Sequence, residues 1–403
     1  MIGFEFDKYT KNLVDADTLS SKYLSKKKLV LEELSKSTMT GWMREIPQTL
    51  IEEILKVRDE IKSRASVLVV IGIGGSFLGS YALNQIFSKK YAKGDTEVIY
   101  LGNGLDSETI LDTFKYLEDK DFYIDVISKS GETTEIMITY SLMKEFMKKK
   151  YSSEEIRKRT IITTDKEKGS LLQEALNNGY RTFEIPRDIG GRYSLMTAAH
   201  LLPLSFNLDI DKLVSGYELG LNLVDEAYYY AALRRYLFDE GKYIESFSVY
   251  QENFSYYLEW LKQLFGETEG KNKKGIFPVS MIGTRDLHSL GQFVQEGNPI
   301  IFETFIKILE TSEVKYKNCK LNDINNLVLE SVKEAHVLNS VPATTIILDK
   351  VNEENMGELS AFMMLSAAYS GYLFEVEPFN QPGVEIYKKI LKEKMQELED
   401  ETI

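Results

Sequence analysis

Cysteine and histidine are scarce in this chain of 403 residues. The single cysteine, Cys319, excludes an intramolecular disulfide and a cysteine-rich zinc site, and it indicates a reducing compartment. The three histidines, His200, His288 and His336, are widely spaced and form no His-x-x-x-His pair. We therefore predict that the chain holds no metal.

A basic charge balance and a long apolar run are also missing. The net charge of -13 argues against a nucleic-acid partner or an anionic membrane surface. No stretch approaches the roughly 18 consecutive apolar residues of a membrane span. The start, MIGFEFDKYTKNL, resembles neither a signal peptide nor a transit peptide. We expect a cytoplasmic protein without a membrane partner. Because the chain is acidic, it must place its basic side chains in the pocket if it binds an anion.

Strand and helix patterns alternate along most of the chain, which predicts an α/β fold. Apolar strands are predicted at 67–71, 97–101, 122–127, 160–164 and 181–185. Such alternation indicates doubly wound parallel sheets in αβα layers, with ligands at the carboxyl ends of the strands and a cleft between two lobes as the default site. The predicted division is a helical N-terminal segment (1–65), a first α/β domain (66–210), a helical connector (211–265), a second α/β domain (266–378) and a C-terminal helix (379–403).

The segment VVIGIGGSFLGS joins a predicted strand to a predicted helix. Its glycines, Gly75 among them, expose backbone N–H groups at a helix start, and Ser76 adds a hydroxyl. Phe77 stands where a dinucleotide fingerprint needs its third glycine, and Ser80 stands where a P-loop needs lysine. A smaller anion such as a phosphomonoester fits the segment, and so does a tight turn without a ligand.

The segment ISKSGETTE crowds hydroxyl groups around a glycine at another predicted helix start. A helix cap with a capping box to Glu135 needs only one hydroxyl. Four hydroxyls beside Lys129 favour a phosphate site instead. The hydroxyls belong to Ser128, Ser130, Thr133 and Thr134.

Four further signals are weak when each is taken alone. Arg192 follows Gly191 in GGRYS, where a guanidinium can come close to a ligand oxygen, although a surface ion pair explains it as well. Glu267 in LFGETEGK has the composition of a solvated acidic loop. His288 precedes a helix, and Gln381 and Lys388 stand at a loop-to-helix junction. His200, on an apolar helix, fits a hydrogen-bonded core histidine better than a catalyst.

Taken together, these segments resemble the phosphoglucose isomerase family, in its short bacterial form. GIGGS, SKSGETTE, GGRYS, LFGETEGK, DLHSLGQ-VQEG and QPGVE-YKK occur in the family's order, from about residue 65 to the end. The resemblance implies paired sugar-isomerase (SIS) type domains. It also implies reversible isomerisation of glucose 6-phosphate and fructose 6-phosphate through a cis-enediol, in glycolysis and gluconeogenesis, without a cofactor.

The resemblance also implies a role for each matching residue. Glu267 matches the catalytic base, Arg192 the arginine that stabilises the enediolate, and His288 and Lys388 the residues that open the sugar ring. In the family the site is shared within a homodimer, and the histidine comes from the neighbouring subunit. The implied sugar-phosphate contacts are Gly75, Ser76, Ser128, Lys129, Ser130, Thr133, Gly191 and Gln381.

Two segments depart from the family pattern and two other functions stay open. Asn298 and Pro299 replace a usual pair of arginines, and EAHVLNSVPATT replaces a usual His-Thr-Asp-Gly-Gly run, so His336 is expected to be structural. The alternatives are an isomerase for another phosphosugar such as mannose 6-phosphate, and a sugar-phosphate-binding regulator. A regulator would be expected to lack the base, the histidine or the lysine, all of which are present.

Overall fold

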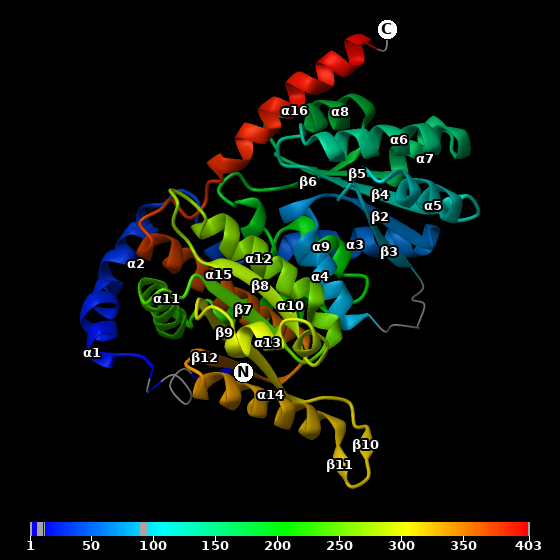
Figure 1. Cartoon of the computed structure of the whole chain (residues 1–403). Helices are drawn as coiled ribbons and strands as arrows, with labels where there is room; N and C mark the ends of the chain where they lie inside the picture. The colour runs from blue at the N-terminus through cyan, green and yellow to red at the C-terminus, as the bar shows by residue number, and fades with distance from the viewer. Residues whose placement is uncertain (1, 6–10, 12, 89–95, 402–403) are drawn as a thin grey trace.

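The computed structural model describes residues 2–5, 11, 13–88 and 96–401. The predicted N-terminal segment, first domain and C-terminal helix each include a few residues outside this range. The chain forms two α/β lobes, each built on one five-stranded sheet (Figure 1).

The sheet of the first lobe is parallel throughout, with the strand order β3-β2-β4-β5-β6. Its central strands are apolar, rich in β-branched residues and buried on both faces, as expected of a parallel sheet covered by helices. The predicted strands are confirmed, although the last one ends a residue early. The bounds are β2 Val67–Ile71, β3 Glu97–Leu101, β4 Phe122–Ile127, β5 Thr160–Thr164 and β6 Arg181–Glu184.

Helices cover both faces of this first sheet (Figure 1). Side chains of α5, α6 and α8 pack on one face, and side chains of α3, α4 and α9 pack on the other. The bounds are α3 Gln48–Arg64, α4 Leu78–Phe87, α5 Ser107–Leu117, α6 Thr134–Lys150, α7 Ser153–Arg159, α8 Ser170–Asn178 and α9 Ala198–Leu204.

The sheet of the second lobe has the order β1-β12-β9-β7-β8, in which only β1 is antiparallel to its neighbour. A small hairpin, β10 with β11, precedes α14. The bounds are β1 Ile2–Glu5, β7 Ile244–Val249, β8 Phe277–Ile282, β9 Ile301–Glu310, β10 Lys315–Tyr316, β11 Cys319–Lys320 and β12 Ala343–Lys350.

The helix α15 lies at the centre of the second lobe and is buried along almost its whole length. It is apolar all round because α10, α11 and α12 pack against it, whereas α13 and α14 lie on the other face of the sheet (Figure 1). The bounds are α1 Ala16–Thr18, α2 Lys27–Lys36, α10 Ile210–Gly220, α11 Val224–Asp239, α12 Ser255–Glu269, α13 Gly291–Glu296, α14 Leu321–Leu338, α15 Glu353–Leu373 and α16 Pro382–Glu401.

Two strands of the second sheet lie in segments that the sequence indicates as helical. β7 runs through the predicted connector 211–265, so a purely helical connector is wrong. The serines and Glu245 of β7 give it a polar sequence although it is an inner strand of the sheet. This is possible because the carboxylate of Glu245 accepts hydrogen bonds from Arg234 and Thr304 inside the core. β1, in the predicted helical N-terminal segment, is a strand because it pairs with the distant β12.

One buried apolar cluster joins the lobes. It includes Leu68 and Val70 of β2 as well as Ile306 of β9 and Ile346 of β12. The two lobes therefore pack against each other through a shared core. None of the helices within the described residues combines the length and the apolar composition needed to span a membrane.

Candidate active site

Glu267 and Arg192 form an ion pair where the two lobes meet. The carboxylate lies in the last turn of α12, so the sequence-based expectation of a solvated loop is wrong. Its Oε2 accepts a hydrogen bond from NH1 of Arg192 at 3.2 Å, and its Oε1 accepts one from Nε2 of Gln263 at 3.0 Å. The Glu267 side chain keeps 31% of its surface exposed while that of Arg192 is wholly buried. A molecule in solvent can therefore reach the carboxylate.

The guanidinium of Arg192 is held rigidly. Arg192 follows β6 in the turn Gly191–Tyr193, called here the arginine turn. Each nitrogen of the guanidinium donates a hydrogen bond, as its five N–H groups allow. The acceptors come from α12 and from the segment that leads into α16. The acceptors are Thr268 Oγ1 at 2.9 Å, Glu267 Oε2 at 3.2 Å, Gln381 Oε1 at 3.1 Å, Asn380 O at 3.3 Å and Pro378 O.

The turn Gly74–Ser76, called here the glycine turn, comes directly after β2 and packs on the arginine turn. A Cβ on Gly75 would lie 2.3 Å from the carbonyl carbon of Gly191, so only glycine fits there. A Cβ on Gly74 would lie 3.1 Å from Nε2 of Gln263. The glycine turn is thus placed beside both Arg192 and the residue that contacts Glu267.

Residues 128–133, called here the serine loop, follow β4 at the same edge of the first sheet. Oγ of Ser128 accepts from the N–H of Gly131 at 3.1 Å, and Oγ of Ser130 accepts from the N–H of Glu132 at 3.2 Å. Thr133 stands at the N-cap of α6 but makes no side-chain capping bond. The capping box weighed from the sequence is therefore not formed, and N–H groups at the start of α6 lack a side-chain cap.

Lys129 ties the serine loop to the segment that leads into the arginine turn. Its Nζ donates to the carbonyls of Arg187 and Ile189, both at 2.9 Å. Burial lowers the pKa of Lys129 below its ordinary value. The glycine turn, the serine loop and the arginine turn are thereby assembled around one region at the end of the first sheet.

The comparison with protein families tests the resemblance carried by the six motifs. The family described as phosphoglucose isomerase matches residues 43–333. The chain belongs to the phosphoglucose isomerase family. The resemblance carried by the six motifs is confirmed, and so is the expectation of an aldose–ketose isomerase.

Curated relatives of this family member share about two fifths of its residues. The glucose-6-phosphate isomerase of Staphylococcus saprophyticus is 41% identical, over 88% of this chain and 86% of the relative. The glucose-6-phosphate isomerase of Leptospira interrogans is 42% identical, over 87% of this chain and 85% of the relative.

Solved structures share the fold. A hypothetical protein from Thermus thermophilus has a TM-score of 0.86 at 25% identity, over 98% of this chain and 100% of that one. A glucose-6-phosphate isomerase from Chlamydia trachomatis has a TM-score of 0.76 at 19% identity, over 90% of this chain and 78% of that one. The predicted fold class, paired SIS-type α/β lobes, is confirmed.

Two residues that the motifs assign to ring opening lie outside the Glu267–Arg192 cluster. His288 is exposed and ends the turn Arg285–His288, and no hydrogen bond or ion pair among the described residues joins it to the cluster. Lys388 is on α16, which projects from the body of the molecule (Figure 1), and its Nζ pairs with Glu385 at 2.8 Å. Gln381, at the base of α16, does reach the cluster through Arg192.

The residues of the site that the sequence reasoning missed are Gln263, Thr268 and Lys271. Gln263 precedes Glu267 by one helical turn, a spacing that would have been informative had α12 been predicted to run through Glu269. Nζ of Lys271 donates to the carbonyl of Thr268 at 3.1 Å and to that of Glu377. Burial, reinforced by Arg192, lowers the pKa of Lys271 to about 8.

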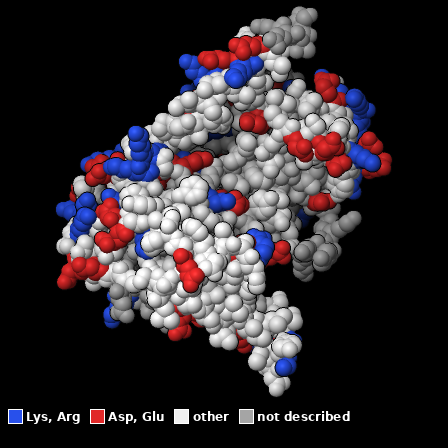
Figure 2. All heavy atoms as spheres, viewed as in Figure 1, with Lys and Arg blue, Asp and Glu red and all other residues white. Residues whose placement is uncertain are grey.

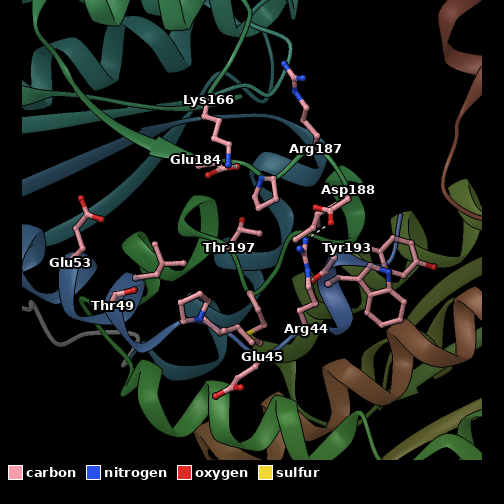
Figure 3. A pocket seen from close by; sticks show the side chains of 18 of the residues that line it. Arg44, Glu45, Thr49, Glu53, Lys166, Glu184, Arg187, Asp188, Tyr193 and Thr197 are labelled. Atoms are coloured by element: carbon pink, nitrogen blue, oxygen red, sulfur yellow. Dashed lines mark hydrogen bonds and ion pairs between the residues drawn. The ribbon is translucent and has the colours of Figure 1, made fainter. Parts of the chain in front are cut away.

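A cavity of about 670 Å³ borders the site without containing Glu267, Arg192 or Gln381 (Figure 3). Tyr193 lines it, and the hydroxyl of Tyr193 lies 3.3 Å from Oγ1 of Thr268. Each basic side chain of the cavity is paired with an acid, which makes the cavity a poor phosphate site. The pairs are Arg44 with Asp188, Lys166 with Glu184, and Arg187 with Asp165 and Glu167.

The face of the molecule in Figure 2 has acidic and basic side chains interspersed, with a hollow between α16 and the first lobe.

His200 and His336 are both buried and hydrogen-bonded, as expected of core histidines. Nδ1 of His336 lies 2.6 Å from Oε2 of Glu303. Neither ring therefore faces an open site.

Proposed function

We propose that this chain interconverts glucose 6-phosphate and fructose 6-phosphate, and that Glu267 moves the proton between C2 and C1. The pairing of Glu267 with Arg192 beside the glycine turn carries this proposal. One carboxylate can remove the proton and return it on the same face of a cis-enediol. Relatives about 40% identical that are named glucose-6-phosphate isomerase support the choice of substrate.

Arg192 stabilises the negative charge that develops on the substrate oxygen. Its side chain is wholly buried, and its NH1 group donates to both Glu267 and Gln381. The planar, delocalised guanidinium of an arginine suits an oxyanion. The plane of the guanidinium is fixed by Thr268 and by the carbonyls of Pro378 and Asn380, so a substrate oxygen has to replace only an acceptor of NH1. A donor oriented in advance in this way stabilises the transition state more than the ground state.

The glycine turn and the serine loop bind the phosphate of the substrate. Ser76 ends the glycine turn, and the uncapped start of α6 offers backbone N–H groups next to Thr133. Lys129 adds a positive charge in the serine loop, although its ammonium is bonded to carbonyls in this state. Binding of the phosphate supplies binding energy far from the reacting carbons. This energy orients C1 and C2 of the substrate relative to Glu267.

A second copy of the chain completes the site by contributing His288. His288 is exposed and separate from the cluster of its own chain, as a residue that serves a neighbouring subunit must be. His288 and Lys388 then open the sugar ring. We place this homodimer in the cytoplasm, in glycolysis and gluconeogenesis.

The test is conversion of fructose 6-phosphate by the purified protein in excess EDTA, with glucose 6-phosphate and mannose 6-phosphate measured in parallel. Rapid formation of glucose 6-phosphate that EDTA does not slow is the expected result. Formation of mannose 6-phosphate alone would show an isomerase for another phosphosugar. Binding of fructose 6-phosphate without turnover would show a sugar-phosphate sensor, and loss of turnover in EDTA would show a metal site.

A further inference from the structure

His200 lies directly behind the glycine turn, where it makes polar contacts with three different segments. It is on α9 and only 2% of its surface is exposed. Its Nδ1 accepts a hydrogen bond from the backbone N–H of Ser80 at 3.0 Å. Its Nε2 lies 2.7 Å from the carbonyl oxygen of Gly75 and 3.2 Å from Oγ of Ser194.

The first contact fixes the tautomer of the ring. Ser80 is in the first turn of α4, where N–H groups have no partner within the helix, and the N-cap Phe77 makes no side-chain cap. Nδ1 of His200 takes the place of that cap and must be unprotonated to accept. A neutral ring then carries its proton on Nε2, and this N–H group donates a hydrogen bond to the carbonyl of Gly75.

The second contact reaches the arginine turn through Ser194. Oγ of Ser194 lies 2.7 Å from the carbonyl oxygen of Gly191 and 3.1 Å from that of Gly75. The hydroxyl of Ser194 thus contacts one carbonyl in each turn, and the ring of His200 contacts this hydroxyl and the carbonyl of Gly75. Gly79 leaves room for the imidazole, because a Cβ there would lie 3.2 Å from Cε1 of His200.

We propose that His200 is a positioning residue of the active site, which sets the glycine turn at a fixed place relative to Arg192 by donating to Gly75. His200 touches no substrate and acts only through that carbonyl. The proposal rests on the proposed function, since it assumes that the phosphate lies against the glycine turn. A shift of the turn would leave a phosphate bound but misplace the sugar carbons against Glu267 and Arg192.

Two substitutions of His200 distinguish the hydrogen bond of Nδ1 from that of Nε2. In His200→Asn the side-chain oxygen can still accept from Ser80, but the amide is too short to reach the carbonyl of Gly75. In His200→Gln the amide N–H₂ reaches the position of Nε2, whereas the acceptor for Ser80 is lost. Both variants lose one contact of a buried ring, so a merely structural role would affect the two alike.

The experiment measures kcat/KM with fructose 6-phosphate, and the Kd values for inorganic phosphate and for sorbitol 6-phosphate, well below the melting temperature of each variant. In His200→Asn we expect kcat/KM to fall about tenfold and sorbitol 6-phosphate to bind several-fold more weakly, with the phosphate Kd within about twofold of the unsubstituted protein. His200→Gln should keep kcat/KM within about threefold because it restores the donor.

Equal losses in the two variants, or unchanged kinetics in both, would overturn the positioning role. The ratio of the two Kd values does not depend on turnover. If the unsubstituted protein binds sorbitol 6-phosphate but turns over nothing, the proposed reaction fails, while a changed ratio in His200→Asn alone still supports the positioning role. If the ratio is the same in all three proteins, the positioning role fails even where the reaction is observed.

Discussion

Gly75 and Gly191 are in backbone contact, although they belong to turns at the ends of different strands. A Cβ on Gly75 would lie 2.3 Å from the carbonyl carbon and 2.5 Å from the carbonyl oxygen of Gly191. The glycine turn and the arginine turn are therefore one packed unit. Because Ser76 follows Gly75 and Arg192 follows Gly191, this contact fixes the backbone of Arg192 relative to that of Ser76, the residue that we propose binds the phosphate.

Gly75→Ala should separate the two turns. The added methyl meets backbone atoms that cannot rotate away, so we expect a loss of about 1–3 kcal/mol in the free energy of unfolding. The displaced turn should lower kcat/KM by about 10²-fold. Urea unfolding and the fructose 6-phosphate assay measure the two effects. Gly104→Ala is the matched control, because a Cβ at Gly104 meets nothing within 4 Å. Similar kinetics in the two variants would mean that the contact does not set the site.

Glu267→Gln should remove the base and leave the fold intact. A glutamine can still accept from Arg192, and its amide can donate to Oε1 of Gln263, which is buried without a partner among the described residues. We expect kcat to fall by about 10³-fold, within the range for loss of a general base. The affinity for sorbitol 6-phosphate should stay within about threefold, because the phosphate grip is untouched.

Glu259→Gln is the control for this substitution. Glu259 is on the same helix, α12, and accepts from Oγ of Ser280 at 3.0 Å, a bond that glutamine can keep. Its kcat should match that of the unsubstituted protein. If Glu267→Gln keeps kcat within a few-fold of that value, another group must move the proton.

The first lobe could be predicted from sequence because its signals are local. The strand β4 is an apolar run that ends in the serine loop, and β2 ends in the glycine turn. Two parallel strands place the groups that follow them at one edge of the sheet, so Ser76 and Ser128 could be brought together without a structure. Arg192 followed from its glycines and from the family motif.

The rest of the site depends on contacts between residues far apart in the chain. β7 could not be read as a strand because Glu245 interrupts its apolar pattern, and only the core shows that Arg234 neutralises this carboxylate. α12 continues into GETEG because Glu269, at its end, is paired with the same buried Arg234. The segment therefore has the composition of a loop and the structure of a helix.

Mixing two defective variants tests the shared site. If His288 serves the neighbouring subunit, a dimer of one Glu267→Gln chain and one His288→Ala chain has one site without either residue and one site with both. Random mixing should then restore about a quarter of the activity of the unsubstituted protein, because half of the dimers are mixed and each has one complete site. The activity is followed after the chains are unfolded and refolded together.

The matched control mixes Glu267→Gln with Arg192→Ala. Both residues belong to the cluster of one chain, so each cluster of the mixed dimer lacks one of them. In that mixture no site regains both Glu267 and Arg192 from a single chain, and no activity should return. Recovery in the control as well as in the test would contradict the assignment of both residues to one chain. Recovery in neither mixture would place His288 with the cluster of its own chain.

The buried imidazole of His200 should make the folded state sensitive to acid. Burial lowers the pKa of His200 from its ordinary value of 6.5 to about 4. Between these values the unfolded chain binds a proton that the folded chain does not bind, so the free energy of unfolding decreases as the pH falls from 6.5 towards 4. The expected loss over this window is about 3 kcal/mol, at roughly 1.4 kcal/mol per pH unit.

The measurement compares urea unfolding of the unsubstituted protein and of His200→Phe at about pH 7 and about pH 4.5. Phenylalanine removes the titrating group and both hydrogen bonds, so its own cost is the same at each pH, and other titrating groups cancel in the difference. The stability gap between the two proteins should therefore narrow in acid. A gap that stays constant would mean that the ring of His200 takes up its proton equally well in both states, and the neutral tautomer that donates to Gly75 would lose its support.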